Sequence, residues 1–225
     1  MIATDVARRL ADVNERIASS GATPGSVTVV AVTKGHGAWA VKAALDAGLA
    51  DVGENYSAEL LEKRAVLGEA GASVRWHFLG HVQRNKVRVL APSVHLWQGL
   101  DRRAAGQEIA RRAPGARVLV QVNVSGDEAR NGCRFDEAPA LATELGALGL
   151  DVRGVMAVGP VGAAEARRAY RRLNTLADRL GLVERSMGMS SDFVTAVEEG
   201  STMVRIGEAL FGAREARTSD ADLRR

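Results

Sequence analysis

The sequence contains few lysines, few aromatic residues and a single cysteine, and these shortages exclude several classes of protein. Of the 30 basic side chains in this chain of 225 residues, four are lysines, so 26 are arginines. The single cysteine, Cys133, excludes an internal disulfide framework and a metal site built from several thiolates. No apolar run reaches the roughly 18 residues that a membrane span requires. The N-terminus has an amphipathic helical pattern and not that of a signal peptide, so we expect a cytoplasmic protein.

The remaining composition is that of one folded domain. The chain is 46% hydrophobic and 25% charged, with a formal net charge of +3. These values exclude a disordered chain. Paired arginines such as Arg8 and Arg9 fall in helical patterns, which favours solvated helix faces over a nucleic-acid surface. We therefore expect a single domain over residues 1–225, with a frayed polar tail from about residue 213.

Short apolar runs alternate with helical patterns along the whole chain. Runs such as VTVVAVT and RVLVQVN are apolar without alternation, which is typical of strands covered on both faces. Helical patterns lie between the strands at about 38–47, 56–70, 82–90, 101–112, 136–148, 162–180 and 190–199, and a further one precedes them at 4–18. The predicted strands are Val27–Thr33, Ala50–Gly53, Arg75–Gly80, Val94–Gln98, Arg117–Asn123, Val152–Val158, Val183–Met187 and Met203–Ile206.

Eight strand–helix units in about 200 residues predict an α/β fold, a compact (β/α)8 TIM barrel with an extra N-terminal helix. An open doubly wound sheet is the alternative. That fold would need a glycine-rich phosphate turn after the first strand, but the motif G-x-G-x-x-G is absent. In such a barrel the functional site lies where the carboxyl ends of the strands meet.

Lys34 is the most informative residue at that end of the barrel. It directly follows the seven residues of the first predicted strand, so its side chain should project at the barrel mouth. A partly desolvated lysine has a lowered pKa and becomes a nucleophile for an aldehyde. The alternative is a strand-end lysine that extends to water. Lys42, Lys63 and Lys86 fall in helical patterns and are interpreted as solvated surface or rim charges.

The segments after the seventh and eighth strands predict an anion site. In SMGMSSD a small-residue loop opens a helix, with Ser190 or Ser191 as the expected N-cap, and Gly207 marks a tight turn from strand to helix. These loops commonly bind phosphate in barrel enzymes. Arg205 is predicted to be buried and to need a partner, which is a ligand, or Asp192 or Glu208 in a structural ion pair.

Two other reactive side chains have an ordinary explanation. His77, between Trp76 and Phe78, is either an acid–base group or a hydrogen-bonded core imidazole. Cys133 lies in a polar loop without an evident histidine partner, which favours an incidental thiol. The histidines show no metal-ligand spacing, so no metal site is expected.

Seven motifs, in order along about four-fifths of the chain, give a family resemblance. The chain resembles the pyridoxal 5′-phosphate homeostasis protein family, a single-barrel relative of the alanine racemase N-terminal domain. The combination of the third, sixth and seventh motifs is highly specific. The motifs are VAVTK (30–34), GENY (53–56), WHFLGHVQRNK (76–86), QVNVSGDEARNGC (121–133), GVMAVGP (154–160), SMGMSSDF (186–193) and STMVRIGEALFGAR (201–214).

The resemblance implies a role for each of several residues toward pyridoxal phosphate. Lys34 is similar to the lysine that forms an internal aldimine with the cofactor, and Arg205 to the arginine that faces the pyridine nitrogen. The phosphate would be bound by Ser186, Gly207 and Glu208, the last two through backbone N–H groups. Asn55 and His77 are similar to residues that border the cofactor. After Lys34 this chain reads Gly-His-Gly, where many relatives have Thr and a nearby Pro.

The resemblance leaves two functions open. The first is a non-enzymatic carrier that holds pyridoxal phosphate, acts in vitamin B6 homeostasis and delivers the cofactor to apoenzymes that depend on it. The second is an amino-acid racemase, which needs an additional acid–base group on the opposite face of the substrate. Only Tyr56 and Tyr170 are available as tyrosines, which favours the carrier. A phosphosugar enzyme in which Lys34 attacks a ketose is a third hypothesis. The absence of a large apolar helix face favours a monomer.

Overall fold

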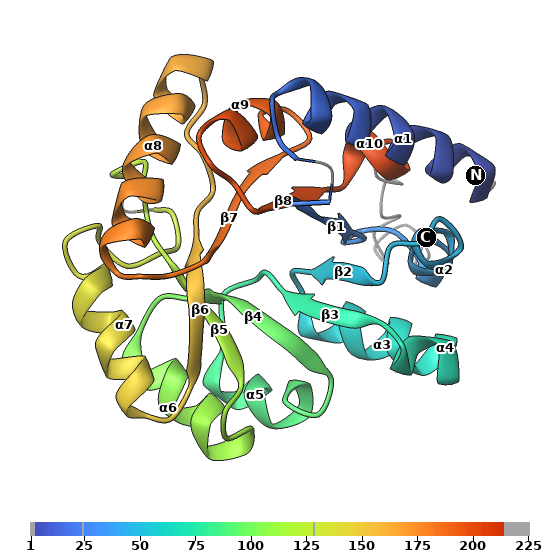
Figure 1. Ribbon diagram of the computed structural model, residues 1–225. Coiled ribbons are helices and arrows are strands. Elements are labelled where there is room, and N and C mark those ends of the chain that lie inside the picture. The colour runs from blue at the N-terminus through green and yellow to red at the C-terminus, as the bar shows by residue number, and fades with distance from the viewer. Residues whose placement is uncertain (1–2, 24, 128, 214–225) are drawn as a thin grey trace, which may run out of the picture.

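The chain forms a closed parallel barrel. The computed structural model describes residues 3–23, 25–127 and 129–213, and in it the eight strands pair in sequence order, with β8 returning to β1 (Figure 1). The predicted (β/α)8 fold is therefore confirmed. The strands are β1 (Thr28–Val32), β2 (Asp51–Glu54), β3 (Arg75–Phe78), β4 (Val94–Leu100), β5 (Arg117–Gln121), β6 (Asp151–Met156), β7 (Glu184–Met189) and β8 (Met203–Ile206).

The helices surround the strands and cover the outer face of the barrel (Figure 1). Each predicted strand and helix has a counterpart, with ends that differ by a few residues. The helices are α1 (Ala3–Ser19), α2 (Ala38–Asp46), α3 (Ser57–Leu67), α4 (Glu69–Ala72), α5 (Arg84–Leu90), α6 (Arg103–Arg112), α7 (Ala138–Ala147), α8 (Ala163–Arg179), α9 (Phe193–Glu198) and α10 (Glu208–Phe211).

Two details differ from the sequence prediction. The single helix expected over 56–70 is divided into α3 and α4 at Gly68, whose φ of +54° lies in the left-handed region that glycine tolerates best. The short helix α10 follows the expected strand-to-helix turn at Gly207, although no helical range was predicted there. Residues 214–225 of the predicted tail lie outside the described residues.

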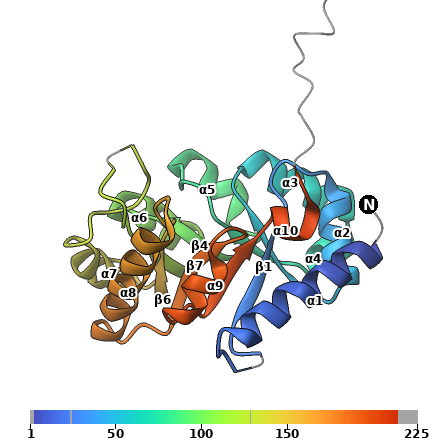
Figure 2. The same cartoon turned by 90° about the horizontal axis from the view of Figure 1, so that it is seen from above.

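The extra helix α1 packs against the barrel as its pattern predicts. Its apolar stripe of Val6, Leu10, Val13 and Ile17 is buried, and the helix contacts α2, α9 and α10. Figure 2 shows α1 running along the outside of the barrel. Within the described ranges, no helix combines the length and the apolar character needed to cross a membrane.

The core has two layers, which explains the apolar strand runs. Side chains that point outward from the strands pack under the helices and form a large continuous cluster. Side chains that point inward form a small second cluster inside the barrel, composed of Val30, Leu96, Leu119, Met156 and Met203. Each strand therefore buries both of its faces, as expected for parallel strands.

Truncating a side chain of the inner cluster should destabilise the fold strongly. Leu119 is fully buried, and Leu119→Ala is expected to lower the free energy of unfolding by roughly 2–5 kcal/mol, because a cavity remains in a closed interior. Urea denaturation followed by circular dichroism measures this loss. Val66→Ala, at an exposed position of α3, should change it by less than about 0.5 kcal/mol. Equal effects of the two substitutions would contradict the two-layer core.

Candidate functional site

A cavity of about 260 Å³ opens at the carboxyl ends of the strands. Five of the seven predicted cofactor-binding residues line it: Lys34, Asn55, Arg205, Gly207 and Glu208. The other lining residues are Val32, Leu79, Met156, Val158, Met189, Ser190 and Ser191. The lysine, the arginine and the glycine turn therefore meet at one site, although Lys34 is distant from the others in the sequence.

The pairing of β1 with β8 creates this meeting point. In the register of the two strands, Val30 lies opposite Arg205 and Ala31 opposite Ile206. Lys34 thus leaves β1 beside the turn that follows β8. A Cβ atom on Gly207 would lie 3.2 Å from the carbonyl oxygen of Val32, which is tighter than ordinary van der Waals contact. Glycine at this position lets the turn approach β1 closely.

The loop after β7, in which the sequence predicts part of an anion site, also lines the cavity. Met189, Ser190 and Ser191 line the cavity, and Ser190 Oγ accepts a hydrogen bond of 3.2 Å from the backbone N–H of Ala209. The prediction that Ser190 or Ser191 caps the next helix is wrong, because Asp192 occupies the N-cap position of α9. A serine pair that follows a strand at the mouth of a barrel was the signal for a lining role.

Arg205 is buried and hydrogen-bonded to neighbouring strands. Its Nη1 donates to the carbonyl oxygen of Ser186 at 2.7 Å and to Ser186 Oγ at 2.8 Å, and its Nη2 donates to the carbonyl oxygen of Ala157 at 2.7 Å. Burial lowers the pKa of the guanidinium from its usual value, although Tyr170 and Asp192 nearby oppose the shift. Arginine nevertheless stays protonated at neutral pH. The hydrogen-bond acceptors of Arg205 are thus carbonyl and hydroxyl oxygens. Asp192, which the sequence offered as an ion-pair partner, accepts a hydrogen bond from Tyr170 Oη at 2.6 Å.

A chain of hydrogen bonds continues from Arg205 through the barrel interior. Ser186 Oγ donates to Gln98 Oε1 at 2.6 Å, and Gln98 Nε2 donates to His77 Nδ1 at 2.7 Å. The other ring nitrogen of His77, Nε2, then donates to Asp51 Oδ1 at 3.0 Å. Each member donates to the next, so the chain is polarised in one direction from a buried cation to a carboxylate.

Two predicted site residues, Ser186 and His77, belong to this chain of hydrogen bonds. Ser186 and His77 are buried and do not line the cavity. They lie behind Arg205, inside the barrel, where they orient its guanidinium and connect it to Asp51. The histidine is therefore a hydrogen-bonded core imidazole in this structure, which is one of the two alternatives that the sequence left open.

Asp51, at the amino end of β2, terminates the chain. Burial alone would raise the pKa of its carboxyl group, but hydrogen bonds from Arg75 and His77 outweigh burial and hold the pKa well below its ordinary value of 3.8. Arg75 Nε and Nη2 donate to the two carboxylate oxygens at 2.8 and 2.5 Å. The carboxylate is thus ionised wherever the protein is folded near neutral pH.

One of the four lysines lies in a different environment from the predicted one. Lys63, on α3, is 3% exposed and is not a solvated surface charge. Its Nζ contacts Glu54 Oε1 at 2.5 Å and Glu59 Oε2 at 3.1 Å. The prediction was wrong because the face of α3 that carries Lys63 packs against the ends of β1 and β2. Lys42 agrees with the prediction, since it is an exposed lysine paired with Asp46.

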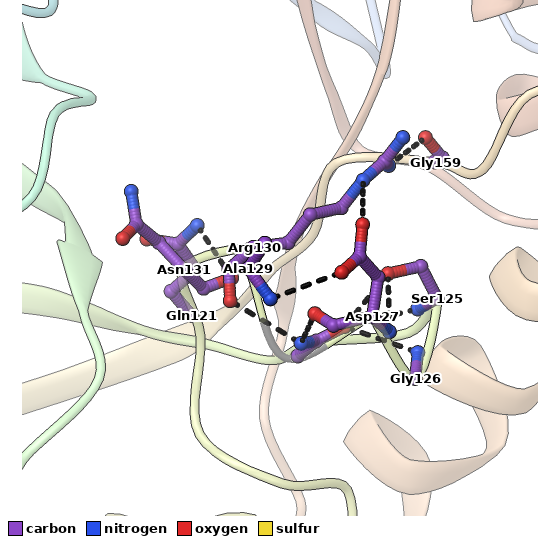
Figure 3. Close-up of polar contacts among 9 residues, drawn as sticks. Gln121, Ser125, Gly126, Asp127, Ala129, Arg130, Asn131 and Gly159 are labelled. Carbon is purple, nitrogen blue, oxygen red and sulfur yellow. Dashed lines mark hydrogen bonds and ion pairs between the residues drawn. The ribbon is translucent and has the colours of Figure 1, made fainter.

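The loop after β5 forms a separate hollow. In Figure 3, the side chain of Arg130 reaches Gly159, whose carbonyl oxygen it contacts at 3.0 Å, and Asp127 accepts from the backbone N–H of Ala129. The hollow beside this loop measures about 520 Å³ and shares no lining residue with the Lys34 cavity.

Burial, with a smaller contribution from Glu137, raises the pKa of the Cys133 thiol to about 12, so this thiol is a poor nucleophile.

The fold and the site together define a class of protein, a (β/α)8 barrel with a strand-end lysine, a buried arginine and a glycine turn at one mouth. The family described as alanine racemase, N-terminal domain, matches residues 9–215. The pyridoxal phosphate homeostasis protein of Pseudomonas aeruginosa is 40% identical over 223 residues, which cover 95% of this chain and 96% of that protein. The chain therefore belongs to the alanine racemase N-terminal domain family and, within it, to the pyridoxal phosphate homeostasis proteins.

Solved structures agree with this assignment. PipY of Synechococcus elongatus, in a structure with PLP bound, has a TM-score of 0.79 and 33% identity, and the match covers 92% of this chain and 100% of PipY. The alanine racemase of Corynebacterium glutamicum has a TM-score of 0.73 at 18% identity, covering 96% of this chain and 62% of the racemase chain. At that identity the second comparison shows only a shared barrel fold.

The hydrogen-bonded chain that ends at Asp51 stabilises the fold near neutral pH, and this contribution should be lost at low pH. Because the folded-state pKa of Asp51 is depressed, its contribution is present above the ordinary pKa and is lost as pH falls below about 4. Between pH 7 and pH 3 the wild type should lose on the order of 1 kcal/mol more unfolding free energy than Asp51→Asn. Urea denaturation at both pH values measures the difference. Asp46→Asn, in an exposed pair, should behave like the wild type, and an equal loss in Asp51→Asn would contradict the assignment.

Proposed function

We propose that this protein binds pyridoxal 5′-phosphate at the barrel mouth, holds it covalently on Lys34 and acts in intracellular vitamin B6 homeostasis. The observation that carries the proposal is the convergence of Lys34, Arg205 and the turn at Gly207 on one cavity. The printed names of the relatives support the same ligand. We extend the proposal to a single cytoplasmic domain that works as a monomer and delivers the cofactor to apoenzymes that depend on it.

The residues around the cavity fit the chemical groups of this cofactor. The backbone N–H groups of Gly207 and Glu208, with the hydroxyl groups of Ser190 and Ser191, are suited to a phosphate. When bound, the cofactor supplies an aldehyde that condenses with a primary amine and releases water. Lys34 is the amine-bearing side chain in the wall of this cavity, and arginine cannot replace it because a guanidinium stays protonated.

Arg205 argues for a carrier rather than an efficient catalyst. A guanidinium that faces the pyridine nitrogen disfavours protonation of the ring, and the ring then withdraws electrons less effectively. Ser186, Gln98 and His77 fix that guanidinium from behind through the hydrogen-bonded chain. Asn55, in the cavity wall, is positioned to border the ring. We therefore propose that the protein holds the cofactor without robust catalysis of its own.

The racemase hypothesis needs a second acid–base group. Tyr170 does not line the cavity, and its phenol donates to Asp192. Burial raises the pKa of this phenol above its usual value, with a further contribution from Asp192. Tyr56 is the other tyrosine of the chain. It is 59% exposed and lines a neighbouring hollow that shares Asn55 with the cavity, which makes it the specific candidate for that role.

Lys34→Ala should abolish covalent attachment of the cofactor. The purified wild type incubated with pyridoxal phosphate should absorb visible light as a protonated imine. After borohydride reduction, peptide mapping should place the adduct on Lys34. Lys34→Ala should lose the band and keep its circular dichroism spectrum, whereas Lys42→Ala, at an exposed lysine, should keep both. A wild type that stays colourless would overturn the cofactor assignment, and trapping of a ketose phosphate instead would favour the phosphosugar hypothesis.

The cofactor-loaded protein should not racemise amino acids at a useful rate. We expect exchange of the α-proton in deuterium oxide, followed by NMR over an amino-acid panel, to be slow and insensitive to Tyr56→Phe. Rapid exchange with racemisation would contradict the carrier. Loss of that exchange in Tyr56→Phe would then identify the phenol as the second acid–base group.

A further inference from the structure

Lys63, Glu54 and Glu59 form a buried ionic cluster next to the turn that follows β1, outside the proposed cofactor site. Lys63 Nζ donates to three oxygen atoms: the carbonyl oxygen of Thr33 at 2.7 Å, Glu54 Oε1 at 2.5 Å and Glu59 Oε2 at 3.1 Å. The side chains of Lys63 and Glu54 are 4% and 0% exposed. An ammonium group has three N–H donors, so all of them are used and the charge of Lys63 is fixed in place.

The cluster holds the residues on both sides of Lys34. Thr33 precedes Lys34, and its carbonyl oxygen accepts from Lys63 while its hydroxyl donates to Glu54 Oε1 at 2.5 Å. Gly35 follows Lys34, and its backbone N–H donates to Glu59 Oε2 at 2.8 Å. Gly35 has φ of +75°, so the chain turns sharply just after the lysine. The backbone of Lys34 is thus fixed from both ends by α3 and β2.

Stability alone is a weak explanation for such a cluster. Desolvating a carboxylate and an ammonium costs several kcal/mol, and apolar residues of similar volume often replace buried ion pairs without loss of stability. Glu54 Oε2 is buried and has no hydrogen-bond partner among the described residues, which adds to that cost. Burial raises the pKa of Glu54, although Lys63 opposes the shift. A costly arrangement beside a reactive amine is consistent with a role in placing that amine.

We propose that Lys63, acting with Glu54 and Glu59, is a positioning residue for Lys34. It fixes the carbonyl group before Lys34 and, through Glu59, the amide group after it, so that the amine is held at the cavity. In the step that it assists, Lys34 Nζ forms a double bond to the aldehyde carbon, and the aldehyde oxygen leaves as water with both protons of the neutral amine. This inference rests on the proposed cofactor, which its test treats separately.

Two ligands distinguish positioning from general support of the barrel. Pyridoxal 5′-phosphate has the aldehyde that Lys34 requires, whereas pyridoxine 5′-phosphate has an alcohol in its place and can bind only noncovalently. A variant that misplaces only Lys34 should lose covalent attachment and keep the binding of the alcohol. A variant that distorts the whole mouth should lose both.

The first experiment compares Lys63→Met with the wild type and with Lys42→Met at an exposed lysine. Titration of the visible band should show at least a tenfold weaker covalent attachment in Lys63→Met. Calorimetry with pyridoxine 5′-phosphate should give a dissociation constant within twofold of the wild type, and Lys42→Met should match the wild type with both ligands. Unchanged attachment in Lys63→Met, or a parallel loss of the alcohol, would overturn the proposal.

Substitutions of Glu59 test the same idea without emptying the interior. The side chain of Glu59 is 20% exposed, so its variants should fold even if Lys63→Met does not. Glu59→Ala frees the amide of Gly35 and should weaken attachment several-fold, whereas Glu59→Gln keeps an acceptor and should restore most of it. Glu62→Ala, at an exposed acid of the same helix, is the matched control.

The Glu59 variants are titrated with the same two ligands, pyridoxal 5′-phosphate and pyridoxine 5′-phosphate. Equal attachment in Glu59→Ala and the wild type, or no rescue by Glu59→Gln, would overturn the positioning role. A wild type that forms no visible band at all would instead refute the proposed function, so the two failures are distinguishable.

Discussion

The pairing of β1 with β8 is the constraint on which the whole site depends. Without this closure, Lys34 and the segment 205–208 would lie on opposite edges of an open sheet. With it, Val30 faces Arg205 across the seam, and the lysine, the arginine and the glycine turn share one cavity. Barrel closure also buries the inner face of every strand. The same hydrogen bonds that remove the sheet edges therefore create both the core and the mouth.

Closure produces a buried interior, and this interior has to accommodate the guanidinium of Arg205. Arg205 donates hydrogen bonds to two carbonyl oxygens and a serine hydroxyl. The onward hydrogen bonds through Gln98 and His77 to Asp51 orient every group in one direction. These ordered partners help the interior to accommodate a buried cation, and an interrupted chain would leave costly unpaired groups. The orientation of Arg205 at the mouth thus depends on residues as far away as the amino end of β2.

Much of this could be predicted from the sequence, and the failures have a common physical cause. Apolar runs and alternating helical patterns specify the barrel, and the place of Lys34 at a strand end specifies its exposure to the mouth. Spacing does not show which side of an element faces the interior. Glu59 and Lys63 are separated by four residues and so resemble an ordinary surface pair, yet the packing of α3 turns them inward. Trp76, His77 and Phe78 are all buried, so polarity alone does not distinguish the barrel interior from the layer under the helices.

The two lysines near the end of β1 illustrate why an arginine-rich chain retains lysine at particular positions. The proposed role of Lys34 requires an amine that can lose its proton, which a guanidinium does not offer. Lys63 instead is a compact group that directs its donors at oxygen atoms from three different residues. A planar guanidinium presents its donors in one plane, which suits such an arrangement less well than an ammonium group does. In the proposed function the same side-chain type would serve as a nucleophile at Lys34 and as a positioning group at Lys63, where it is buried among carboxylates.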